Sequence, residues 1–180
     1  MIRIAAVTVT FLLAACQVVP QKYDENSPFS QVPDNSRLIL NQALTIAPYG
    51  LKAYVQNGQI SYGPNQYYPF CKFEVRVVKE TSQIVEPDEF EITKVRQASG
   101  LMAGLNRHAL IAGISFDSND GKPSPIVYAT QLFLNSPRQP QVYKLSCGHL
   151  QDPGLEARHL SINQIREALG GVFTLQTTVE

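Results

Sequence analysis

YPFCKFEVRVV, residues 68–78, is the stretch that most clearly predicts a fold for this chain. Apolar and polar residues alternate along it, so one face of an extended strand carries four apolar side chains: Cys71, Phe73, Val75 and Val77. Residues 141–147 alternate in the same way and place Cys147 on their apolar face. The two runs predict strands with one buried face, as is common in antiparallel sheets.

Shorter runs of the same kind lie on both sides. We expect strands within residues 37–46, 53–56, 59–62, 84–85, 89–96, 109–116, 126–134 and 172–175. Asn57-Gly58 favours a type I′ hairpin turn, because both central residues of that turn need positive φ. Residues 97–108 contain two glycines and no period, so we expect a mobile loop there. The sequence predicts a mainly β (α+β) domain, either an antiparallel sandwich or a partly open barrel.

One short helix is predicted near the carboxyl terminus, at about residues 161–169. Ser161 fits the N-cap, and Gln164 three residues later completes a capping box. Apolar side chains fall along one face of the segment: Ile162, Ile165 and Leu169. Gly170 or Gly171 can end the helix in the left-handed conformation. We expect this helix to cover one end of the sheet.

The amino-terminal segment differs in composition from the rest. Residues 4–13, IAAVTVTFLL, are apolar, but a helix of that length is only about 15 Å long, half the hydrocarbon core of a bilayer. Arg3 precedes the run and Ala14-Ala15 follow it. This pattern is typical of a secretory signal peptide, and a retained membrane helix is the less favoured alternative.

Leu13-Ala14-Ala15-Cys16 resembles the lipobox of bacterial lipoproteins; the alternative is an ordinary secretory signal in which the cysteine is coincidental. The resemblance implies cleavage before Cys16, diacylglycerol on the Cys16 thiol and acylation of the new amino terminus with a fatty acid such as palmitate. Two or three acyl chains would make a firm anchor. Gln17 stands where an aspartate favours the inner membrane in the enterobacterial sorting pattern. We therefore expect the inner leaflet of the outer membrane, with the protein facing the periplasm.

This interpretation divides the chain into three parts. Residues 1–15 would be a removed signal peptide, residues 16–36 a lipidated cysteine with a flexible tether, and residues 37–180 a β-rich periplasmic domain. The mature part would carry one more acidic than basic residue, which gives no broad electrostatic argument for nucleic acid or anionic lipid. We expect no cofactor, a membrane anchor and a protein partner in the envelope.

The chain has three cysteines. With Cys16 lipidated, Cys71 and Cys147 remain, and two remaining cysteines in an exported protein favour one disulfide. Two buried free thiols are the alternative. A catalytic thiol is less favoured, because neither cysteine lies at a predicted helix start or beside an obvious base.

Residues 147–159 hold the best candidates for chemistry. His149, Asp152, Glu156 and His159 are residue types that bind zinc. Pro153-Gly154 interrupts the segment and the spacing is not that of a helical H-x-x-x-H pair, so histidines that anchor a loop are the favoured alternative. The sequence contains no G-x-S-x-G motif and no P-loop.

Four aromatic residues surround Pro64 and Pro69: Tyr62, Tyr67, Tyr68 and Phe70. Aromatic rings on a rigid turn can stack on sugars or contact a partner protein. The alternative is that they cap the core at the end of the sheet. They are the candidate binding residues.

The body of the chain, with YPFCKFEVRV, the cysteine before Gly148-His149 and the closing helix, resembles parts of uncharacterised proteobacterial envelope lipoproteins. That resemblance implies no activity. We expect a non-enzymatic interaction or scaffold module anchored in the envelope. A periplasmic module that binds glycan, lipid or a small molecule is the first alternative, and a metal-dependent hydrolase is the second.

Overall fold

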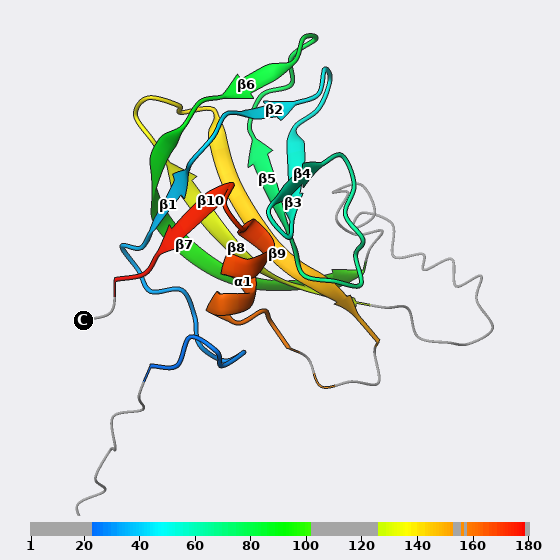
Figure 1. The fold of residues 1–180 in the computed structure, drawn as a ribbon, viewed down its shortest axis with the longest axis vertical. Helices are drawn as coiled ribbons and strands as arrows, with labels where there is room; N and C mark the ends of the chain where they lie inside the picture. The colour runs from blue at the N-terminus through cyan, green and yellow to red at the C-terminus, as the bar shows by residue number, and fades with distance from the viewer. Residues whose placement is uncertain (1–22, 102–125, 153–155, 157, 179–180) are drawn as a thin grey trace, which may run out of the picture.

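The computed structural model describes residues 23–101, 126–152, 156 and 158–178. They form a mostly β protein, in which a large antiparallel sheet curls into a half-barrel and one short helix follows near the carboxyl terminus (Figure 1). This confirms the predicted fold class and favours the partly open barrel over the sandwich. The lipobox and the predicted strand at 109–116 lie outside these residues. Within them, no helix has the length and apolar character that crossing a membrane requires.

In the described residues the large sheet has eight strands in the order β10-β1-β7-β8-β9-β5-β3-β4, and β2 pairs with β6 in a separate sheet. All of the neighbouring strands are antiparallel. The bounds are β1 Arg37–Leu40, β2 Leu44–Ile46, β3 Lys52–Gln56, β4 Gln59–Ser61, β5 Phe70–Val75, β6 Gln83–Val85, β7 Asp88–Leu101, β8 Ile126–Asn135, β9 Val142–Gln151 and β10 Phe173–Gln176.

The helix α1, Ile162–Leu169, lies across the open side of the half-barrel (Figure 1). It packs against β10, one end of the strand order, and against β3 and β5 near the other end, so it bridges the opening of the half-barrel. Ser161 is the N-cap, and both bonds of the predicted capping box with Gln164 are present. Gly170 ends the helix with a φ of 52°.

The hairpin turn between β3 and β4 fastens onto the end of α1. Asn57 and Gly58 both have positive φ, at 50° and 71°, as the predicted type I′ turn requires. The Gly58 N–H donates to the Ala168 carbonyl at 3.1 Å. A Cβ on Gly170 would lie 2.4 Å from the Gly58 Cα, so this close approach needs glycine.

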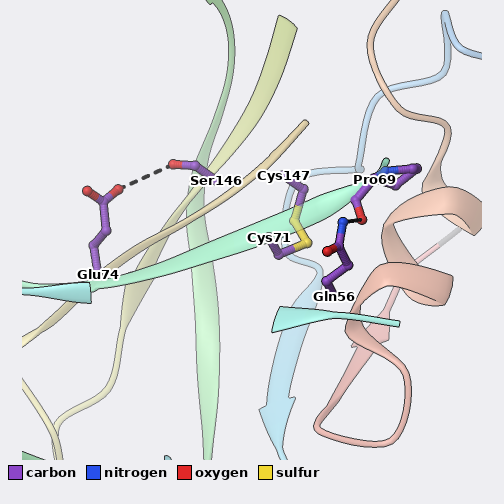
Figure 2. The surroundings of a disulfide bond; sticks show 6 residues. All are labelled: Gln56, Pro69, Cys71, Glu74, Ser146 and Cys147. Carbon is purple, nitrogen blue, oxygen red and sulfur yellow. Dashed lines mark hydrogen bonds between the residues drawn. A yellow bond between two sulfur atoms is a disulfide. The ribbon is translucent and has the colours of Figure 1, made fainter. Parts of the chain in front are cut away.

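The core lies between the inner face of the sheet and α1. The predicted apolar face of residues 37–46 is buried, although the run divides into β1 and β2. Phe73 packs on Phe90 and Phe173 at ring-centroid distances of 6.1 and 5.3 Å. The Cys71 and Cys147 Sγ atoms are 2.06 Å apart, so the predicted disulfide joins β5 to β9 (Figure 2).

Two local predictions differ from the structure. Residues 97–101 belong to β7 rather than to a loop, because they pair with residues 126–130 of β8. That pairing is long-range and leaves no alternating pattern in the sequence. Val77 is exposed, because β5 ends at Val75 and the alternation continues beyond the strand. Residues 102–108 lie outside the described part of the chain.

The predicted tether is wrong over residues 23–36, which pack against the domain. Val32 is only 3% exposed and belongs to the core. The Glu25 carboxylate accepts hydrogen bonds from the Arg166 guanidinium of α1, at 2.5 Å and 3.0 Å. Burial of Val32 and this ion pair hold the segment in place, so the folded domain extends amino-terminal to the predicted boundary at residue 37.

Candidate functional site

The tyrosine loop, residues 62–69 between β4 and β5, is held from two sides. The Gln56 side chain of β3 donates to the Pro69 carbonyl at 3.2 Å (Figure 2). It also donates to the Asn65 carbonyl at 2.8 Å and accepts from the Asn65 N–H at 3.0 Å. On the other side the Leu150 N–H of β9 donates to the Gln66 carbonyl at 2.7 Å. These bonds fix the loop backbone relative to the sheet.

The loop exposes three of the four predicted aromatic residues. Tyr62, Tyr67 and Tyr68 are 82%, 70% and 61% exposed. Phe70 is only 7% exposed, because it begins β5 and packs edge-on against Tyr54 at a centroid distance of 6.1 Å. The structure therefore corrects the candidate set: Phe70 is buried, and the three tyrosines form an exposed surface.

A histidine pocket of about 620 Å³ lies between the end of β9 and the start of α1. Its lining includes His149, Glu156 and His159, so the structure brings together three of the four predicted residues. His149 lies opposite Tyr128 of β8, and the Tyr128 ring meets the His159 ring edge-on at 5.8 Å. Tyr128 is thus a neighbour of both histidines, and no local sequence pattern indicated it.

Both histidines are half-buried. The Nδ1 atoms of His149 and His159 are buried and have no hydrogen-bond partner in the part of the chain that the structure describes. Burial lowers the pKa of each histidine below the ordinary value of 6.5. A neutral imidazole has one donor and one acceptor nitrogen, so each histidine has hydrogen-bonding capacity that the described residues do not use.

Much of the remaining pocket lining is already hydrogen-bonded within the protein. Gln151 accepts from the Arg158 N–H at 3.1 Å. At the start of α1 the Asn163 N–H donates to the Glu25 carbonyl at 3.2 Å, and the Gln164 N–H donates to the Ser161 hydroxyl at 3.2 Å. The pocket therefore presents its imidazoles rather than a free helix terminus.

The predicted zinc set is not assembled in the described residues. Asp152 is exposed and does not line the pocket. The described residues contain no group of three or more His, Cys, Asp or Glu side chains that could hold a metal ion. Cys147 is in the disulfide and offers no thiol as a ligand or nucleophile.

A third surface, the outer side of the sheet, was missed from the sequence. Two rows of side chains cross five adjacent strands in register, from β7 to β3. One row is Lys94, Phe133, Lys144, Glu74 and Lys52, and the other is Arg96, Gln131, Ser146, Lys72 and Tyr54. Together with Arg76 and Tyr143 beside them, we call these rows the basic face. Alternation placed some of these residues opposite the core, but only the strand register shows that they are neighbours.

Comparisons with protein-family models, with curated proteins and with solved structures found no match for this chain. Three local features of the described residues bear on its function: the exposed tyrosine loop, the histidine pocket and the basic face.

Proposed function

We propose that the chain is a lipid-anchored envelope protein that binds another envelope protein through its tyrosine loop. The observation that supports binding is the exposure of Tyr62, Tyr67 and Tyr68 on a backbone fixed by Gln56. The lipobox at Cys16 and a disulfide between Cys71 and Cys147 are both consistent with an exported protein.

The energetics favour this loop as a contact surface. Tyrosine is enriched among the residues that dominate protein interfaces, because its ring buries a large apolar area while its hydroxyl can still hydrogen-bond. Binding costs less when the backbone is already ordered. Since Gln56 and Leu150 hold the loop backbone, only the tyrosine side chains need to become ordered on binding.

Site-specific photocrosslinking tests the protein partner. A photoreactive amino acid at position 67 should give one adduct of defined mass in intact cells, while the same group at position 49 should not. Tyr49 is a matched control, because it is 72% exposed but lies on a different turn. The identified partner should bind purified parent protein about ten-fold more tightly than Tyr67→Ser/Tyr68→Ser. Equal adducts at 49 and 67 would contradict the proposal.

Labelled palmitate tests the anchor separately. The parent protein should incorporate label and sediment with membranes, whereas Cys16→Ser should lose both properties. The disulfide partners provide the control, because Cys71→Ser/Cys147→Ser should keep its label. Equal labelling of parent and Cys16→Ser would rule out the lipobox interpretation.

Binding of a small uncharged polar ligand in the histidine pocket is a second candidate function. The specific support is the pair of buried, unpartnered Nδ1 atoms of His149 and His159 in one pocket of the described residues. Neutral mono- and disaccharides are suitable probes. At least one should raise the melting temperature of the parent and leave that of His149→Leu unchanged. No shift of the parent with any of them would reject this candidate.

A further inference from the structure

Positive charge is concentrated on the basic face. It carries six cationic side chains around the single carboxylate of Glu74: Lys52, Lys72, Arg76, Lys94, Arg96 and Lys144. Elsewhere in the described residues, four of the other five cations form ion pairs: Arg37 with Glu89, Arg138 with Asp88, Arg158 with Glu156 and Arg166 with Glu25. The whole chain has a formal charge of zero, so the local excess on this face is not a consequence of composition.

The centre of the basic face is ordered. Lys72 Nζ and Lys144 Nζ lie 3.1 and 3.3 Å from the two oxygens of Glu74, and Ser146 donates to the same carboxylate at 3.4 Å (Figure 2). The two lysine side chains are only 12% and 14% exposed. A bound anion would therefore meet cations that are already positioned, which lowers the entropic cost of binding.

Aromatic rings alternate with these cations. Lys144 Nζ lies 5.2 Å from the ring centroid of Tyr143 and 5.9 Å from that of Phe133. Arg76 Cζ lies 4.6 Å from the Tyr143 centroid, and Lys52 Nζ lies 5.5 Å from the Tyr54 centroid. A ring beside a cation suits a sugar that bears a carboxylate, because the apolar face of the sugar can stack while the carboxylate pairs.

The size of the face suits an extended chain. Neighbouring strands are about 4.8 Å apart, so a row across five strands is roughly 19 Å long. Cations stand at both ends of the first row, at Lys94 and Lys52, with Lys144 between them. Such a row can contact several charges of one polymer at the same time, and a single small ion would use only part of it.

The position of the amino-terminal segment argues against a bilayer as the ligand of the basic face. This argument rests on the proposed lipid anchor. Asn26 and Glu25 are bonded to α1, on the open side of the half-barrel, whereas β8 and β9 lie in the middle of the strand order. Residues 17–22 span at most about 20 Å. The anchored side and the basic face then point in different directions, and the recessed Lys72 and Lys144 project little.

We propose that the basic face binds a carboxylate-bearing glycan chain. Calorimetry on the full mature chain with Cys16→Ser should detect binding of oligogalacturonate that weakens as salt is raised. Neutral dextran oligomers of equal length should not bind. The calorimetry needs no lipid. If oligogalacturonate does not bind while the parent protein still incorporates labelled palmitate, the glycan proposal is overturned and the proposed anchor is unaffected.

Two variants test the face itself. Arg96→Glu should weaken oligogalacturonate binding by about ten-fold, while Lys79→Glu, an exposed cation outside the face with the same charge change, should have little effect. Phe133→Leu should weaken oligogalacturonate more than polyglutamate, because only the sugar uses the ring. Equal losses of oligogalacturonate affinity in Arg96→Glu and Lys79→Glu would overturn the proposal. So would parent protein that binds polyglutamate, single-stranded DNA or phosphatidylglycerol vesicles more tightly than oligogalacturonate.

Discussion

Gly148 shows how one residue controls the packing of three strands. It lies in β9 between Ala129 of β8 and Phe70 of β5. A Cβ at this position would lie 2.4 Å from the Tyr128 carbonyl oxygen and 3.1 Å from the Ala129 Cα. Both obstacles are backbone atoms of a paired strand, so a side-chain rotation cannot relieve the contact.

Gly148→Ala should therefore lower the free energy of unfolding by about 2–3 kcal/mol, within the range for overpacking a closely packed site. Urea denaturation of parent and variant measures the change. Gly63→Ala is the matched control, because nothing lies within 4 Å of the Cβ it would add. Similar losses of stability in both variants would show that the contact with Tyr128 is not the cause.

The half-buried histidines His149 and His159 predict acid sensitivity. Desolvation lowers the pKa of His149 and His159 in the folded state below the 6.5 of an exposed histidine. The unfolded chain then binds more protons than the folded chain as pH falls below 6.5, so protonation favours unfolding. The urea midpoint of the parent should decrease as pH falls from 6.5 through the lowered pKa. In His159→Gln this dependence should be weaker, and an unchanged slope would contradict the assignment.

At the scale of elements, the sequence predicted best those elements whose signals lie within a few consecutive residues. The helix α1 was predicted because its N-cap, its buried face and its terminal glycine lie within a few consecutive residues: Ser161, Gln164, Ile165 and Gly170. The Asn57-Gly58 turn was predicted for the same reason. In contrast, residues 97–101 join β7 only through their pairing with β8, which involves residues about 30 positions later.

The candidate sites were predicted only in part. Alternation placed Cys71 and Cys147 on buried faces, and register makes them direct partners in β5 and β9. Tyr68 and Phe70 are similar in sequence context, yet one is exposed and the other buried, because the strand begins between them. The basic face could not be predicted, because its neighbours come from five strands whose order the sequence does not specify.

The disulfide between β5 and β9 should contribute strongly to stability. It joins residues separated by 76 positions, and the chain-entropy model gives roughly 4.5 kcal/mol for a loop of that size. Cys71→Ala/Cys147→Ala should lose about 2–5 kcal/mol of unfolding free energy. Reduction of the parent with dithiothreitol is the control and should give a similar loss. A variant as stable as the oxidised parent would contradict this expectation.

At the scale of the whole molecule, closure of the half-barrel depends on segments that are distant in sequence. The helix α1 lies between β10 and β3, and the amino-terminal segment 23–36 lies on the outer side of the helix start. That segment also contributes Asn26 and Pro28 to the histidine pocket. The pocket thus lies on the side from which the proposed anchor extends, while the basic face lies on the sheet opposite α1.

The Glu25 and Arg166 ion pair should hold this arrangement together. The pKa of the Glu25 carboxyl lies below its ordinary 4.5, chiefly because the carboxylate accepts hydrogen bonds from Arg166. A further hydrogen bond from Thr177 lowers this pKa in the same direction. This stabilisation is present above pH 4.5 and is lost as pH falls through the lowered pKa.

Glu25→Gln should cost about 1–2 kcal/mol of unfolding free energy at pH 7, measured by urea denaturation, and the difference from the parent should disappear in acid. Glu167→Gln, an exposed carboxylate of the same helix, should cost little. A Glu25→Gln loss that persists unchanged below the lowered pKa would show that packing of the segment, rather than this charge pair, holds it against the domain.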